Sequence, residues 1–241
     1  PAPLADGIAR TVAAERAFWN DLKEPYFVAL VPLAGRASGV SAGGTGRGDG
    51  FVLYATPSGA DELGKTIARE HTHTWIPGRT GRMPPKDEAT AYWFSEGFTD
   101  FFTTRTALRA GLITVDEAVA RMEGVRRAYD ASPARGATAQ RIAADFRKDR
   151  DVEQAPYQRG QLLALKWDEA VRRKTGGKAD LDDVILRMRD HYRQFPTGQG
   201  PDLVTGLVSA VWVTAGLDIR PDVARYGEGE AAIPLPEELF G

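Results

Sequence analysis

The stretch REHTHTWIPGRTGRMPPKDEATAYWFSEGFTD, residues 69–100, decides how the chain builds its candidate site. Its first segment is Arg69-Glu70-His71-Thr72-His73. Successive residues of a helix lie about 100° apart, so His71 and His73 point roughly 200° apart and cannot share one ion. Position 73 instead shares its face with position 69, at the four-residue spacing that lets two side chains hold one metal. Residue 69, however, is an arginine.

This segment differs at one position from the zinc-binding motif H-E-x-x-H. In the intact motif two histidines hold the zinc, and the glutamate takes a proton from the zinc-bound water. The end of the stretch, WFSEGFTD at residues 93–100, is expected on the next helix. There Glu96 stands where a third, carboxylate ligand would come from. Asp100, one turn later, can orient a ligand histidine.

Composition limits the classes of function that the chain can have. It has 241 residues, a formal net charge of −2 and no cysteine. A general nucleic-acid binder would show a basic excess, and thiolate chemistry and disulfides are excluded. The most apolar run, residues 26–33, is far shorter than the roughly 20 residues of a membrane-spanning helix. We therefore expect a soluble protein without nucleic-acid or membrane partners, whose compartment and oligomeric state the sequence does not assign.

The hydrophobic pattern predicts an α+β fold that is mainly helical. Two short strands are expected after a first helix, and the glycine-rich segment between them is expected to be a flexible loop. A capping box at Thr114 starts one of the later helices, and Gly176 ends another. The expected ranges are a helix at 4–22, strands at 26–33 and 51–56, a loop at 41–50, and helices at 60–75, 88–110, 114–130, 138–147, 157–174, 180–194 and 202–215.

Aromatic residues on the helix of Glu96 are expected to form the core. Large apolar side chains at helical spacing are typical of a buried stripe. His191, between two polar residues, is expected at the surface. The predicted core residues are Trp93, Phe94, Phe98, Phe101 and Phe102.

With these segments in this order, the sequence resembles the glycyl aminopeptidases, gluzincin zinc metallopeptidases related to thermolysin. The likeness extends from the first helix to about residue 235. It implies a thermolysin-like catalytic subdomain with a small sheet over residues 1–110 and a helical bundle subdomain over residues 111–241. The family's N-terminal β-domain and PDZ-like domain are not visible. Further matching segments are HTW at 73–75, YQRG at 157–160, RRKTGGK at 172–178 and LDDV at 181–184.

The resemblance also implies roles for single residues. His73 and Glu96 would be zinc ligands, Glu70 the general base, and Tyr157 the hydroxyl that stabilises the oxyanion of the tetrahedral intermediate. Asp100 would support the ligands. The family activity is hydrolysis at peptide N-termini, so the expected partner is a peptide substrate or peptide ligand.

Two departures from the family pattern put this activity in doubt. Arg69 stands at a ligand position, and a guanidinium has no lone pair to give to a metal. We therefore expect an impaired zinc site in which Arg69 makes an ion pair with Glu96 or Glu70. In addition, the segment from Gly43 to Gly50, GGTGRGDG, lacks the glutamate with which the family recognises the substrate amine.

Other interpretations stay open. The chain could be an active zinc aminopeptidase with altered metal ligation, or a non-catalytic module that binds peptides or partners. The segment from Gly59 to Thr66 fits the P-loop pattern for nucleotides, but Asp61 and Glu62 put negative charge where phosphates bind. Outside any site, His73 and Glu96 would be a buried histidine and a helix carboxylate with local partners, and Tyr157 would be a core aromatic.

Overall fold

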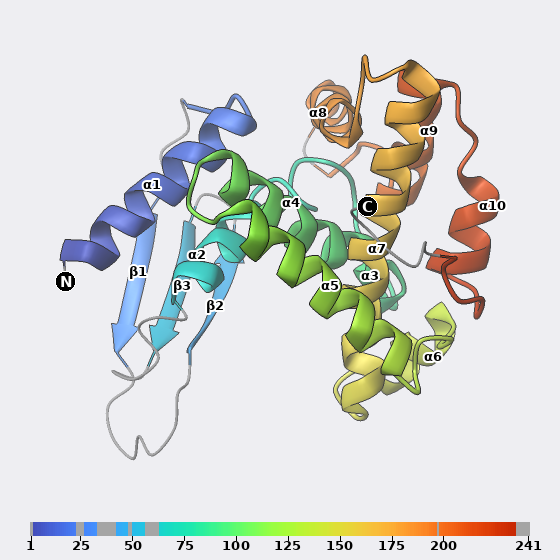
Figure 1. Cartoon of the computed structure of the whole chain (residues 1–241), viewed down its shortest axis with the longest axis horizontal. Coiled ribbons are helices and arrows are strands. Elements are labelled where there is room, and N and C mark those ends of the chain that lie inside the picture. Colours follow the sequence, from blue (N-terminus) through green and yellow to red (C-terminus); the bar gives the residue numbers. More distant parts are fainter. Residues whose placement is uncertain are drawn as a thin grey trace.

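The computed structural model describes a mainly helical chain with one small sheet. The sheet lies at one end of the long axis, and α8, α9 and α10 lie at the other (Figure 1). No helix within the described ranges is long and apolar enough to cross a membrane. The described residues are 2–22, 27–32, 42–47, 50–55, 63–196 and 198–234.

The order of elements follows the predicted order. The elements are α1 (Ala2–Phe18), β1 (Phe27–Pro32), β2 (Ala42–Arg47), β3 (Gly50–Ala55), α2 (Leu63–Thr72), η2 (Glu88–Ala91), α3 (Tyr92–Ser95), α4 (Gly97–Arg109), α5 (Val115–Ala131), α6 (Ala139–Asp145), α7 (Arg150–Thr175), α8 (Leu181–Tyr192), α9 (Leu203–Ala215), α10 (Arg220–Asp222) and η3 (Val223–Gly227).

The sheet contains a strand that the sequence did not predict. Its order is β1-β3-β2, with β1 parallel and β2 antiparallel to β3. The expected loop at 41–50 was wrong for residues 42–47, because β2 pairs with β3 along its whole length. Glycine is unfavourable in isolated strands, and here backbone pairing with β3 outweighs that preference. Residues 33–41 and 48–49 lie outside the described residues.

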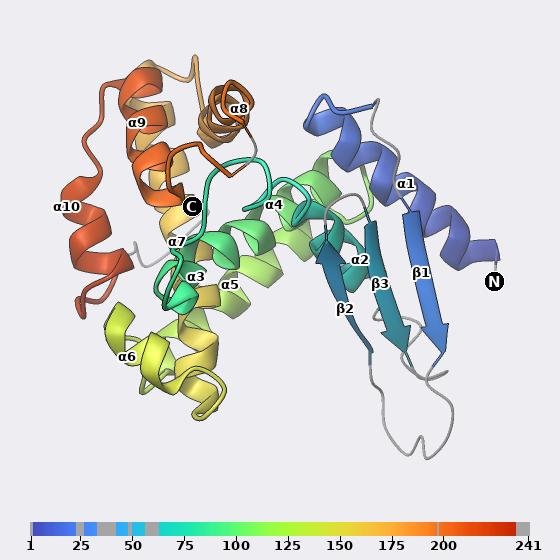
Figure 2. The same ribbon diagram turned by 180° about the vertical axis from the view of Figure 1, so that it is seen from behind.

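Helices α1 and α2 cover one face of the sheet (Figures 1 and 2). Leu53 of β3 and Ile67 of α2 are fully buried between them. Trp19, at the end of α1, stacks on Trp75, with ring centroids 5.4 Å apart. These contacts fix the position of α2, which carries Arg69 to Thr72 of the motif.

The predicted helix 88–110 is divided into η2, α3 and α4, and Glu96 stands between α3 and α4. The aromatic stripe on α3 and α4 is confirmed as core, since all five of its side chains are buried. Trp93 and Phe98 contact Trp167 of α7, with ring centroids 5.9 and 6.1 Å apart. The core therefore lies between the segment carrying Glu96 and α7.

Helix α7 begins seven residues before the predicted position 157. Asp149 caps its first turn by accepting bonds from the amides of Asp151 and Val152. Pro156 lies inside the helix, although proline normally ends one. Val152 and Ala155 are buried in a small cluster with residues near α6, and this packing holds the extra turns. The predicted division at residue 110 stays a prediction.

Candidate active site

Helix α2 packs beside α4 and brings the two motif segments together. Arg69, Glu70 and His73 come from α2 and the turn after it, while Glu96 stands at the junction of α3 and α4. Asp100 follows one turn later on α4. The structure therefore brings Arg69, Glu70, His73, Glu96 and Asp100 together in one place.

The Arg69 guanidinium is the centre of this cluster. Its Nε donates to Asp100 Oδ1 at 3.0 Å, and its Nη1 donates to Glu70 Oε1 at 3.0 Å. Its Nη2 donates to Glu96 Oε2. An ion pair of Arg69 with Glu96 or Glu70 was expected, and the structure has both; the pair with Asp100 was not predicted. A planar guanidinium carries five N–H groups in a fixed fork, which suits several carboxylates at once.

His73 lies on the other side of the same Glu96 oxygen. Its Nε2 is 3.5 Å from Glu96 Oε2. Its Nδ1 is 2.8 Å from the carbonyl oxygen of Ile76, and since a carbonyl only accepts, Nδ1 carries the proton of this bond. The Thr99 hydroxyl is 3.4 Å from the same nitrogen. This arrangement fixes the ring so that Nε2 points at Glu96.

The charges of the cluster shift one another's pKa values. Burial alone would lower the pKa of Arg69, but Asp100, Glu96 and Glu70 together raise it. Burial would raise the pKa of Glu96, yet His73 and Arg69 hold it below its usual value. For Asp100 burial outweighs Arg69, so its pKa is raised. Arg69 therefore stays charged, and it stabilises the Glu96 carboxylate together with His73, whose effect on that pKa is the larger one.

These residues do not fit a zinc ion. A zinc site in a peptidase uses three protein ligands at about 2.0–2.3 Å plus water. Of the ligand positions that the family resemblance implies, His73 and Glu96 carry side chains that can bind a metal, and the Glu96 oxygen that faces His73 accepts a bond from Arg69. Among the described residues, no group of three His, Cys, Asp or Glu side chains could hold a metal.

The ring of Tyr157, on α7, packs against the Arg69 guanidinium. The Arg69 Cζ is 5.5 Å from the Tyr157 ring centroid, a cation–π contact. Burial raises the pKa of Tyr157. Tyr157, Arg69, Glu70 and Asp100 all line one cleft of about 760 Å³, with walls from α2, α4, α5 and α7 and Tyr54 from β3. Tyr157 thus shares a cleft with Glu70, as expected.

Two glycines set the distance between Glu96 and Tyr157. A Cβ on Gly160 of α7 would lie 1.7 Å from the Trp93 carbonyl oxygen, and one on Gly97 would lie 2.5 Å from the Gly160 Cα. The backbones of the α3–α4 junction and α7 therefore touch. Both glycines lie in the segments WFSEGFTD and YQRG, but the sequence alone predicts no role for either. Gly97 directly follows Glu96, and Gly160 lies one helical turn after Tyr157. This closeness to two candidate site residues was the sequence signal that could have identified the glycines.

His71 points away from the cluster, as its helical position predicts. Its Nδ1 is 2.6 Å from Glu15 Oε2 of α1, and both side chains are buried. The Thr72 hydroxyl donates to the other Glu15 oxygen at 3.1 Å. Burial lowers the pKa of His71 to about 3 and raises that of Glu15. This polar contact joins α1 to α2 behind the site.

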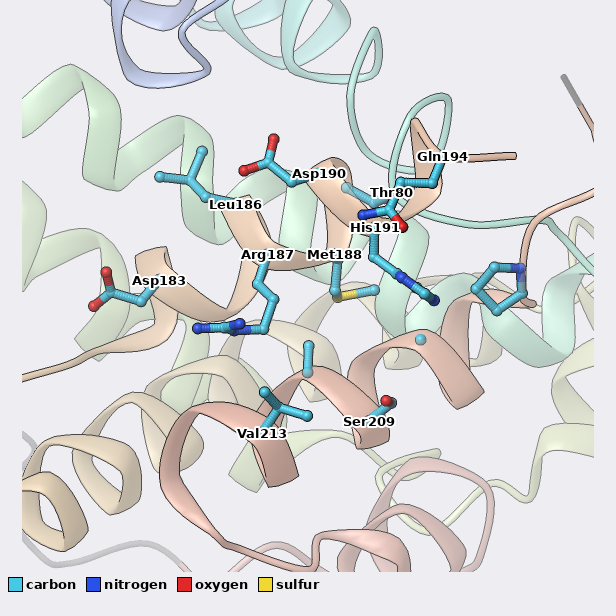
Figure 3. Close-up of a pocket in the computed structure, with 13 residues that line it drawn as sticks. Thr80, Asp183, Leu186, Arg187, Met188, Asp190, His191, Gln194, Ser209 and Val213 are labelled. Carbon is cyan, nitrogen blue, oxygen red and sulfur yellow. The ribbon is translucent and has the colours of Figure 1, made fainter. Parts of the chain in front are cut away.

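Other candidate positions lie elsewhere or outside the described residues. His191 is exposed at the end of α8, in a separate groove of about 510 Å³ between α8 and α9 (Figure 3). Arg187 crosses this groove and donates to the Thr214 hydroxyl at 3.0 Å. Residues 56–62 lie outside the described residues, so most of the P-loop pattern from Gly59 to Thr66 is not described and nucleotide binding stays a prediction.

Comparisons with known proteins agree with the family predicted from the sequence. The model of the M61 glycyl aminopeptidase family matches residues 63–163, the part that contains the cluster and Tyr157. An aminopeptidase N family protein from Idiomarina loihiensis has a similar structure, with a TM-score of 0.77 and 15% identity. The match covers 99% of this chain and 44% of that one, so this chain spans less than half of its length. No curated protein matches.

Proposed function

We propose that this member of the glycyl aminopeptidase family is a metallopeptidase-like protein in which Arg69 takes the place of the zinc ion. In this proposal the chain binds peptides in its cleft without hydrolysing them. The observation that carries it is the Arg69 guanidinium, which donates to Glu70, Glu96 and Asp100. A fixed cation thus neutralises carboxylates that a zinc ion would otherwise neutralise.

Charge and ligand number both disfavour zinc binding. His73 and Glu96 supply two ligands where a peptidase site uses three. A zinc ion would also have to approach a permanent cation and take the Glu96 oxygen from it. Glu70, the candidate base, is held by Arg69 Nη1, and without zinc there is no activated water for it to deprotonate.

The finer description of the fold is part of the proposal. We propose a thermolysin-like subdomain over residues 1–110 and a helical subdomain over residues 111–241. The arrangement of α2 and α4 beside the small sheet supports the first, and the run of helices from α5 onward supports the second. Because this chain matches only 44% of its structural relative, the proposal does not extend to the activity of that whole protein.

Zinc binding of the wild type and of Arg69→His tests the proposal. We expect the wild type to purify with little zinc and to bind it weakly in a calorimetric titration. Arg69→His restores the four-residue histidine pair and should bind zinc at least about tenfold more tightly. Arg127→His is the matched control, since it adds a histidine at an exposed position of α5, away from His73 and Glu96.

A glycyl or alanyl chromogenic substrate provides the second readout. We expect no turnover by the wild type, and zinc-loaded Arg69→His need not regain it because the amine-recognising glutamate is missing from the glycine-rich segment. Stoichiometric, tightly held zinc in the wild type, with turnover abolished by a chelator, would overturn the proposal. It would support instead an active aminopeptidase with altered ligation.

A further inference from the structure

One wall of the cleft is a face of α5 that carries an arginine. Arg121, Gly124, Val125 and Ala128 line the cleft at the three- and four-residue spacing of a single helix face. This face shares the cavity with Arg69, Glu70 and Asp100 of the cluster. Arg121 therefore brings a second positive charge to the cleft that contains the candidate site.

The Arg121 guanidinium is available to a ligand. Among the described residues, no carboxylate forms an ion pair with it and no hydrogen bond involves its side chain. Glu117, one turn earlier on α5, is close enough for the Arg121 charge to lower its pKa, but less than its hydrogen bonds to Thr114 do. Glu117 accepts bonds from the Thr114 amide and hydroxyl, at 2.7 and 3.1 Å, in the capping box that starts α5. Glu70 and Asp100 are bound to Arg69.

The remaining walls offer hydrogen bonds that suit a peptide backbone. Gln154, Gln158 and Gln161 line the cleft from α7 on the face that also carries Tyr157. The Gln158 Oε1 atom is buried and accepts no hydrogen bond from any described residue. Glutamine side chains both donate and accept hydrogen bonds, as a peptide backbone requires.

We infer that Arg121 binds a carboxylate of the peptide that occupies the cleft, and so makes the site selective for acidic or free C-terminal peptides. This inference rests on the proposed peptide binding. A guanidinium and a carboxylate form charge-assisted hydrogen bonds that are about twice as strong as neutral ones. The carboxylate can belong to the C-terminus or to an aspartate or glutamate side chain, which share this chemistry.

Three peptides separate these sources when they are titrated calorimetrically into the full chain. They are penta-alanine with a free carboxylate, the same peptide as its C-terminal amide, and Ala-Ala-Glu-Ala-Ala amide. We expect at least one carboxylate peptide to bind about tenfold more tightly than penta-alanine amide, with the difference reduced in high salt. The tighter of the two identifies the source of the carboxylate.

Variants of α5 assign the preference to Arg121. Arg121→Gln should abolish the difference between acid and amide, whereas Arg127→Gln, an exposed arginine of the same helix that does not line the cleft, should keep it. Gly124→Leu should weaken all three peptides, because a Cβ on Gly124 meets no described atom within 4 Å and its side chain would fill the cleft.

The outcomes distinguish this inference from the proposed function. Equal binding of acid and amide by the wild type, or an unchanged preference in Arg121→Gln, overturns the role of Arg121 and leaves peptide binding intact. No binding of any peptide overturns both. Tight zinc binding by the wild type overturns only the proposed replacement of the metal.

Discussion

Two clusters of charged side chains in this protein differ in how their charges balance. The cleft cluster has one arginine, Arg69, and three carboxylates, and it borders an open cavity. The second cluster, here called the helix network, has three arginines and three aspartates where α4 and α7 meet the start of α8. Its members are Arg105, Arg109, Arg172, Asp168, Asp180 and Asp182.

The helix network shares its carboxylates among several cations. Arg105 contacts all three aspartates at 2.8–3.0 Å. Arg172 also pairs with Asp168 and Asp180, at 2.9 and 2.6 Å, and Arg109 pairs with Asp182. In the cleft cluster, Arg69 is the only arginine among the described residues that pairs with Glu70 and Asp100. The helix network therefore keeps each aspartate paired even if one arginine is lost. The cleft cluster depends on Arg69 alone, as a metal site depends on its ion.

The largest expected effect follows from this difference in sharing. Arg69→Ala leaves three partly buried carboxylates with no arginine partner, and we expect a loss of about 2–4 kcal/mol in the free energy of unfolding. The value lies below that of a fully buried pair because the Arg69 side chain is 27% exposed. Arg105→Ala should cost less, about 1–2 kcal/mol, since each aspartate keeps another arginine.

Urea denaturation of both variants with a chelator present measures this comparison. The chelator prevents any metal from neutralising the exposed carboxylates. If Arg105→Ala lost as much free energy of unfolding as Arg69→Ala, or more, the sharing of carboxylates among arginines would not explain how strongly each cluster depends on one arginine.

The second prediction concerns the close backbone contact between Gly160 of α7 and the α3–α4 junction, which lies beside the cleft cluster. Gly160→Ala would place a Cβ 1.7 Å from the Trp93 carbonyl oxygen, so α7 and the α3–α4 junction must separate. We expect a loss of about 2–3 kcal/mol. Tyr157 fluorescence would be masked by tryptophan, so the peptide affinity of the cleft is the site-specific readout. Unchanged stability and affinity would contradict a fixed distance between Glu96 and Tyr157.

The two clusters should also respond differently to acid. Burial would raise the pKa of Asp168, but Arg105 and the other donors lower it, so its stabilisation is present above about pH 4 and is lost below. Burial raises the pKa of Asp100, so its contribution has the opposite sign: present below about pH 4 and lost as the pH rises through its raised pKa.

Unfolding free energies between pH 2.5 and 6 test these signs. Asp168→Asn should flatten the acid-induced loss of stability, whereas Asp100→Asn should steepen the rise with pH. Each change amounts to at most about 1.4 kcal/mol per pH unit for one proton. Slopes that change in the same direction would show that Asp100 and Asp168 have similar environments.

The smallest effect is expected at Gly124, on the cleft wall. Gly124→Ala should stabilise the chain by about 0.5–1 kcal/mol, because alanine favours a helix and its Cβ meets no described atom within 4 Å. Thermal unfolding against the wild type measures it. A lower melting temperature would mean that the cleft is narrower at this point than the structure indicates.

The sequence by itself determined features that depend on local spacing. Thr114 with Glu117 predicted the capping box, and the aromatic stripe on the helix of Glu96 predicted the core. The four-residue interval between Arg69 and His73 predicted their shared face, and the order of motif segments predicted the similarity to the glycyl aminopeptidase family, whose model matches residues 63–163. Each of these follows from helix periodicity or from a chemical pattern within a few residues.

Only the tertiary structure decided contacts between distant segments. The glycines of β2 form a strand because β3 pairs with them, and α7 begins before Pro156 because Val152 packs near α6. Asp100 joins Arg69, and Arg121 reaches the same cleft, because helices far apart in the sequence pack together. Local propensities amount to about 1 kcal/mol or less for most residues and about 3 kcal/mol for a proline inside a helix, and here pairing and burial across segments override them.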